Sequence, residues 1–78
     1  LPRNNGLHLN SARAMVGRHV NLHLRDGSVI VNVRVAEALH GSPSVLCYKA
    51  SDRRKAYKVP LRDVDWLEPL NPYLFTLA

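Results

Sequence analysis

Hydrophobic and polar residues alternate with a period of two from residue 18 onward, which is the pattern of a half-buried β-strand. Val20, Leu22 and Leu24 are separated by polar residues and predict the first strand. Asp26 and Gly27 follow, a dipeptide that favours hairpin turns because both residues tolerate a positive φ. The chain is therefore predicted to turn back on itself here as a β-hairpin.

The second half of this hairpin is a longer run of hydrophobic residues. Its valines recur at every second position, so we expect them to share one face of the strand: Val29, Val31, Val33 and Val35. Ile30 lies between Ser28 and Asn32 and falls on the other face. This strand is predicted to be partly covered on both sides.

Three more short strands are predicted, separated by turn-forming residues. They cover residues 44–50, 55–59 and 64–67. Turns are expected at residues 40–43 and 51–54. Because Pro60 has no backbone N–H, it is expected to end or bend the fourth strand.

A short helix is predicted over residues 9–16, with Asn10 or Ser11 as its N-cap and Gly17 ending it. Such a helix is marginal alone and must lay its apolar side on the rest of the protein. That side is expected to comprise Leu9, Ala12, Met15 and Val16. A helix followed by five short strands predicts an all-β fold, a small SH3-like barrel of five bent antiparallel strands.

The length and net charge of the chain limit the functions that it can have. The chain has 78 residues, one cysteine and a formal net charge of +5, with a pI near 10.0. This length supports one modest core, and Cys47 alone cannot form an internal disulfide, so self-association is expected to add stability. The positive charge favours binding to a polyanion such as RNA or DNA, the alternative being that it only maintains solubility.

The residues that carry enzyme or metal chemistry do not form a recognisable set. His19 and His23 point the same way on one strand but stand about 13 Å apart at the strand rise, too far to share one ion. Asp63 and Asp65 are expected to share a strand face near Arg62 and to form salt bridges. A buried, inert thiol is expected at position 47. We therefore expect no catalysis, no metal site and no cofactor.

Several short motifs taken together resemble the Sm-like family, and within it the bacterial Hfq branch. They are Leu9-Asn10 and the short helix, Val20-x-Leu22-x-Leu24, Asp26-Gly27, and Tyr57-Lys58 followed by Leu61 and Val64. The likeness spans about residues 9–67, and the Tyr57-Lys58 pair is its most specific part.

This resemblance implies a helix that caps a strongly bent five-stranded sheet. It also implies that the fourth and fifth strands of neighbouring subunits pair into a ring, with a lysine and a histidine lining a pore that takes up uridine-rich RNA. Lys58 matches that lysine, whereas Val59 stands at the histidine. Asn5 and Gly6 occupy the places nearest the family's glutamine and aspartate. The segment over residues 36–44 is a few residues longer than its counterpart in Hfq, which predicts a remodelled loop between strands two and three. With these departures, the chain is interpreted as a divergent Sm-like protein.

A basic set is expected to bind RNA because a ring would repeat it once per subunit, forming a belt along the phosphate backbone. Tyr48 and Tyr57 offer aromatic faces on which bases can stack, although a strand tyrosine more often serves packing. The alternative for residues 53–55 is a solvated hairpin tip. The candidate RNA-binding residues are Lys49, Arg53, Arg54, Lys55, Tyr57, Lys58 and Arg62.

The leading hypothesis is a non-catalytic, homo-oligomeric ring that binds single-stranded RNA. One alternative is a protein-interaction module that uses Trp66 and the apolar tail, and another is a barrel that binds duplex DNA. The predicted divisions are an extension over residues 1–8, the barrel over 9–68 and the tail over 69–78, which is expected to pack on its own barrel or on a neighbouring subunit. With no apolar run of membrane-spanning length, we expect no membrane partner and a cytoplasmic location.

Overall fold

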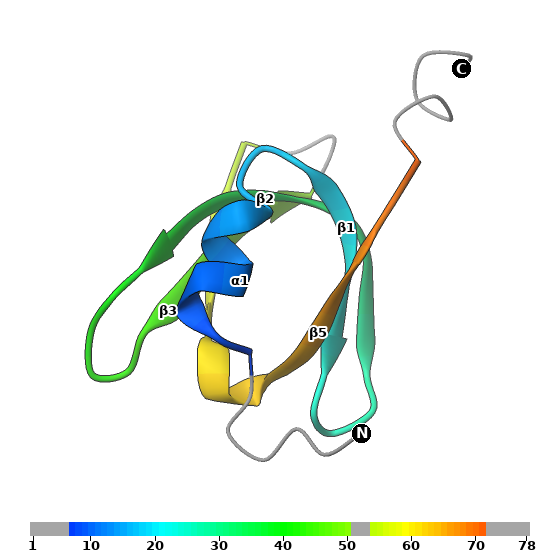
Figure 1. Cartoon of the computed structure of the whole chain (residues 1–78). Coiled ribbons are helices and arrows are strands. Elements are labelled where there is room, and N and C mark those ends of the chain that lie inside the picture. Colours follow the sequence, from blue (N-terminus) through cyan, green and yellow to red (C-terminus); the bar gives the residue numbers. More distant parts are fainter. Residues whose placement is uncertain (1–6, 51–53, 72–78) are drawn as a thin grey trace.

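One bent antiparallel sheet and one short helix make up the structure, a computed structural model that describes residues 7–50 and 54–71. The strand order is β4-β3-β2-β1-β5. Figure 1 shows the sheet curling around the helix, which lies on its concave side. In chain order the elements are α1 (Leu9–Ala14), β1 (His19–Leu24), β2 (Val29–Leu39), β3 (Val45–Ala50), β4 (Ala56–Pro60), the 3₁₀ helix η1 (Leu61–Asp63) and β5 (Val64–Pro69).

The predicted set of five antiparallel strands with one short helix is confirmed. Closure into a barrel is not seen: within the described residues β4 and β5 are the two edges of the sheet and do not pair with each other. The sheet of one chain is therefore open, and each edge strand has one side without a strand partner in the part of the chain described.

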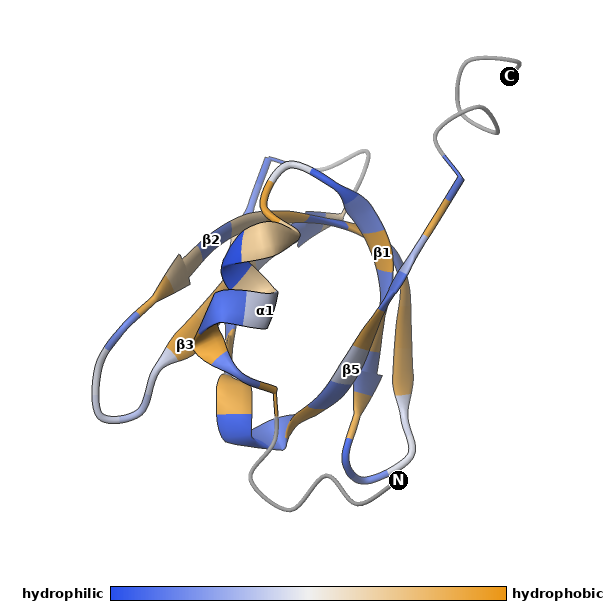
Figure 2. Cartoon of the chain, in the orientation of Figure 1, coloured by the Kyte–Doolittle hydropathy of each residue, from blue (hydrophilic) through white to orange (hydrophobic). Residues whose placement is uncertain are grey.

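The core lies on the concave side of the sheet, which we call the inner face. Along the strands hydrophobic and hydrophilic residues alternate (Figure 2). Helix α1 contributes Ala12, which is fully buried against the strands. Leu22 and Leu46 are the largest fully buried side chains. The remaining buried members of this cluster are Val20, Val33, Val35, Ala38, Leu61, Val64 and Leu67.

The helix is shorter than predicted, and its N-cap is different. It begins after His8, whose Nδ1 accepts a hydrogen bond from the backbone N–H of Asn10 at 3.3 Å, so the prediction of Asn10 or Ser11 as cap is wrong. Gly17 ends the turn that follows the helix with a φ of +87°, a conformation that glycine adopts without steric cost. Val16 belongs to this turn and is 44% exposed, so it is not part of the helix's buried side.

Strand β2 does not place its four valines on one face, and that prediction is wrong. The pairing of β1 with β2 shifts register between Val20 and Leu22, where β2 carries an extra residue. Asn32 adopts a φ of +54° at this bulge, and its N–H donates to Oδ1 of Asn21 at 3.0 Å. The extra residue therefore reverses the face toward which the following side chains of β2 point. Val29 and Val31 are 44% and 67% exposed, whereas the valines beyond the bulge are buried.

Other differences concern the ends of elements. The 3₁₀ helix η1 was not predicted, and because Asp63 belongs to it, Asp63 and Asp65 do not share a strand face. Strand β2 continues to Leu39, so much of the segment expected as a remodelled loop is strand. Pro60 ends β4 as predicted, and β5 runs on to Pro69. The predicted turn at 51–54 and the tail beyond residue 71 lie wholly or mainly outside the described residues.

Over the described residues, no helix has the length and apolar character needed to cross a membrane.

The position of the core predicts two contrasting substitutions. Leu22→Ala removes a side chain with no exposed area and is expected to lower the free energy of unfolding by about 3 kcal/mol. Val31→Ala, in the adjacent strand but 67% exposed, should change it by less than about 0.5 kcal/mol. Urea unfolding followed by Trp66 fluorescence measures both. Equal losses for the two variants would contradict the reversal of faces in β2.

Candidate nucleic-acid interface

A pair of tyrosines lies at the open edge of the sheet beyond the core. Tyr57 on β4 is the cross-strand partner of Tyr48 on β3, and the two rings stack with centroids 5.8 Å apart and planes 26° from parallel. Tyr48 packs against the core, whereas Tyr57 is 40% exposed. The inner ring therefore supports the outer one, which is the arrangement required for a flat stacking surface.

A lysine accompanies this pair. Nζ of Lys55 lies over the ring of Tyr57, 5.4 Å from its centroid, within the range of a cation–π contact. Burial raises the pKa of the Tyr48 phenol above its ordinary value, with a smaller contribution from Tyr57. A phenol with the ordinary pKa of 10.0 is already neutral at physiological pH and the shift moves Tyr48 further from ionisation, so Tyr48 places no negative charge beside the lysine. The site thus combines an aromatic surface with a cation.

Two other predicted lysines lie on the opposite, convex side of the sheet, which we call the outer face. In β4 successive side chains alternate, so Lys58, opposite Cys47, points away from the core while Tyr57 points toward it. Lys49 lies on the same outer face and is directly opposite Arg34 of β2. The buried thiol expected at Cys47 is confirmed; it lies between Lys58 on one side and Glu37 on the other.

The remaining predicted residues are divided between the two ends of β4. Arg54 is exposed and lies just before the strand, near Lys55. Arg53 lies outside the described residues. Arg62 is exposed in η1, after the strand, and its carbonyl oxygen accepts a hydrogen bond from Nη1 of Arg25 at 3.2 Å. The described members of the predicted basic set are therefore spread over both faces and both ends of β4 and do not form one cluster.

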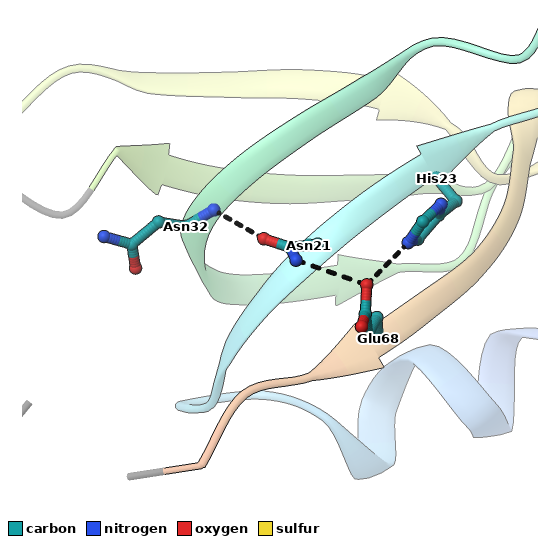
Figure 3. Close-up of polar contacts among 4 residues, drawn as sticks. All are labelled: Asn21, His23, Asn32 and Glu68. Carbon is teal, nitrogen blue, oxygen red and sulfur yellow. Dashed lines mark hydrogen bonds and ion pairs between the residues drawn. The ribbon is translucent and has the colours of Figure 1, made fainter. Parts of the chain in front are cut away.

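A polar network on the outer face was not predicted (Figure 3). Oε1 of Glu68, on β5, accepts a hydrogen bond from Nδ2 of Asn21 at 3.2 Å. The same oxygen lies 2.9 Å from Nε2 of His23. Because a carboxylate only accepts, the His23 Nε2 carries a hydrogen in this contact. The bonds from His23 and then Asn21 hold the pKa of the Glu68 carboxyl below its usual value. Glu68 is 45 residues from His23 in sequence, so no local pattern could have revealed the contact.

His23 also stacks on Trp66, with ring centroids 4.3 Å apart and planes 16° from parallel. Trp66 is 43% exposed, so the stack covers one side of the indole and leaves much of it at the surface. Within the described ranges, no three His, Cys, Asp or Glu side chains are grouped so that they could hold a metal ion. The bond from His23 to Glu68 and the stack of His23 on Trp66 together orient an aromatic surface.

Charge is distributed unevenly over the described residues. Of their five carboxylate side chains, only Glu37 lies away from β5, η1 and the β1–β2 turn; the others are Asp26, Asp63, Asp65 and Glu68. The β3–β4 side carries Lys49, Arg54, Lys55 and Lys58. One edge strand is thus basic and the other acidic.

Comparison of the chain with protein-family models, with curated proteins and with solved structures found no match.

The lowered pKa of Glu68 predicts a pH-dependent contribution to stability. Since its folded-state pKa is below 4.5, the ionised carboxylate stabilises the fold above that pH, and this stabilisation is lost as the pH falls through the lowered value. Wild type is expected to be more stable than Glu68→Gln at pH 6, and the difference should shrink between pH 5 and pH 3. Thermal unfolding across this range measures it, with Glu37→Gln as the control. A difference that grows on acidification would contradict the assignment.

Proposed function

We propose that this protein binds single-stranded RNA without catalysis and acts as a self-associated, Sm-like ring. The observation that carries the proposal is the exposed ring of Tyr57, backed by Tyr48 and accompanied by Lys55 at the edge of the sheet.

Base stacking is the first argument for RNA. Proteins that bind single strands place aromatic rings where unpaired bases can stack, and each such contact contributes about 1–3 kcal/mol. Tyr57 is exposed enough to offer its ring to a base, and Tyr48 limits its movement. Lys55 lies over that ring, so a stacking base would displace it, and its ammonium group would then pair with the phosphate of the same nucleotide.

Charge is the second argument. Arg54, Lys55 and Lys58 lie on or just before one short edge strand, where among the described residues no carboxylate accompanies them. Lys49 and Arg34 extend the positive charge across the outer face of β3 and β2. One chain offers only a few phosphate contacts, and weak contacts of this kind become useful when repeated along a strand.

The open edges supply that repetition. An unpaired edge strand tends to pair with another chain, and a head-to-tail contact between two different edges closes into a ring when the rotation allows. Basic β4 and acidic β5 attract each other between subunits, while two copies of the same edge repel. Both are edge strands, as the resemblance to the Sm-like family requires of the subunit contact.

Substitutions on β4 are expected to weaken RNA binding in two distinguishable ways. Tyr57→Leu keeps an apolar side chain against Tyr48 but removes the flat ring, so affinity for a U-rich or A-rich oligonucleotide should fall about ten-fold. Lys55→Gln should lower affinity and reduce the slope of log affinity against log salt by about 0.7 for each phosphate that the lysine neutralises in the wild type. Electrophoretic retardation over a salt series measures both.

The matched control for these variants is Arg18→Gln, which removes an exposed cation at the turn after α1. It should leave affinity almost unchanged. A duplex competitor should be less effective than the single strand. Unchanged affinity in Tyr57→Leu and Lys55→Gln, or preferential binding of duplex, would contradict the proposal.

Self-association is tested without RNA. Light scattering of nuclease-treated protein should give a mass several times the 8.8 kDa of one chain. The double variant Lys55→Glu, Lys58→Glu gives β4 the charge sign of β5 and should shift the mass toward one chain, because the two edges then repel. A wild-type mass of one chain at micromolar concentration would contradict the ring.

A further inference from the structure

A second surface remains after the RNA interface is assigned, on the outer face near the β1–β2 turn. His23 is the cross-strand partner of Val29 on one side and of Trp66 on the other, so these side chains form one row across three strands. Val31 lies two residues beyond Val29 along β2, next to this row. We call these four residues the outer patch.

The outer patch is more exposed than packing within one chain requires. Val29, Val31 and Trp66 are 44%, 67% and 43% exposed. The bulge at Asn32 keeps both valines out of the core, and the network of Asn21 and Glu68 fixes the ring of His23 against the indole. Exposed apolar side chains beside an imidazole ring that polar bonds hold in place are typical of a binding site.

Carboxylates lie next to members of this patch along the chain. Asp26 lies in the turn before Val29, and Ser28 holds the pKa of its carboxyl below the usual value through its hydroxyl and then its N–H, at 2.6 and 2.9 Å. Asp63 and Asp65 precede Trp66, and Glu68 follows it. At this end of the molecule, four carboxylates outnumber the guanidiniums of Arg25 and Arg62, and Arg25 is hydrogen-bonded to the backbone of Arg62.

We propose that the outer patch binds an extended, positively charged protein segment that places an aliphatic or aromatic side chain beside Trp66. The apolar side chains supply contact area, and the exposed carboxylates of Asp26 and Asp63 pair with lysines or arginines of the segment. The same carboxylates repel the phosphates of RNA, which separates this site from the basic side of the sheet. Segment binding and base stacking use different residues, because Val29, His23 and Trp66 lie on β2, β1 and β5 whereas Tyr57 lies on β4.

Trp66 is the chain's only tryptophan and therefore reports directly on the site. The probe is a tryptophan-free heptapeptide of alternating lysine and leucine, titrated into the whole protein at low salt. Its binding should shift Trp66 emission to the blue in a saturable way. A peptide of the same pattern with glutamate in place of lysine should cause no shift.

Substitutions test which residues bind the basic peptide. Asp26→Asn and Asp63→Asn should each weaken binding of the basic peptide about two- to five-fold, as expected for exposed ion pairs. Val31→Ser should weaken it further, and its high exposure leaves the fold intact. Glu37→Gln, on the outer face of β2 but away from the patch, is the matched control and should have no effect.

Three results would overturn the proposal. The first is an unchanged emission spectrum, or equal binding of the lysine and glutamate peptides. The second is a saturable shift caused by single-stranded RNA in place of the peptide. The third is a shift that appears on concentrating the protein alone and is abolished by Val31→Ser, which would assign the patch to a second copy of the chain. Because RNA retardation is measured separately on β4 variants, failure here is distinguishable from failure of the proposed function.

Discussion

The arrangement of the two faces of the sheet depends on the hydrogen bonds of the Asn21 side chain. Its Oδ1 accepts the N–H of Asn32 at the bulge in β2, and its Nδ2 donates to Glu68 on β5. One residue in β1 thus connects three strands at the point where β2 gains an extra residue. A bulge adds twist and reverses which face the following side chains take. Without it, the valines on the two sides of Asn32 would compete for one face, and the sheet would have either a smaller core or no outer patch.

The open sheet sets the second constraint. A single core in so short a chain stabilises the fold only modestly, and two exposed edges add a risk of uncontrolled pairing. In the proposed ring, opposite charges on the edges would make pairing selective, because basic β4 attracts acidic β5 and repels another β4. Strand order and charge therefore act together: the topology places β4 and β5 at the edges, and their side chains determine which edges attract each other.

Local patterns in the sequence predicted most of the helices and strands, but not which face of the sheet every side chain takes. The strand pattern around Val20 and the turn at Gly27 agree with β1 and the hairpin, since both are decided by neighbouring residues. The bulge was missed because an alternating row of valines looks regular, although Asn32 is one of the few residue types that readily adopt a positive φ. The contact of His23 with Glu68 was out of reach for a different reason, since it requires the register of β1 with β5.

The candidate site shows the same division between local and non-local information. Sequence singled out Tyr48, Tyr57 and Lys55 by type, and cross-strand pairing brings these three together. It also grouped Lys58 and Arg62 with them, but strand alternation places Lys58 on the other face, and Arg62 lies in η1, beyond the far end of β4. A basic belt that includes every predicted residue therefore requires neighbouring subunits, whereas the aromatic surface with its lysine is complete within one. Under the proposed function, stacking would be a property of the single chain, and continuous attraction of a phosphate backbone would be a property of the assembly.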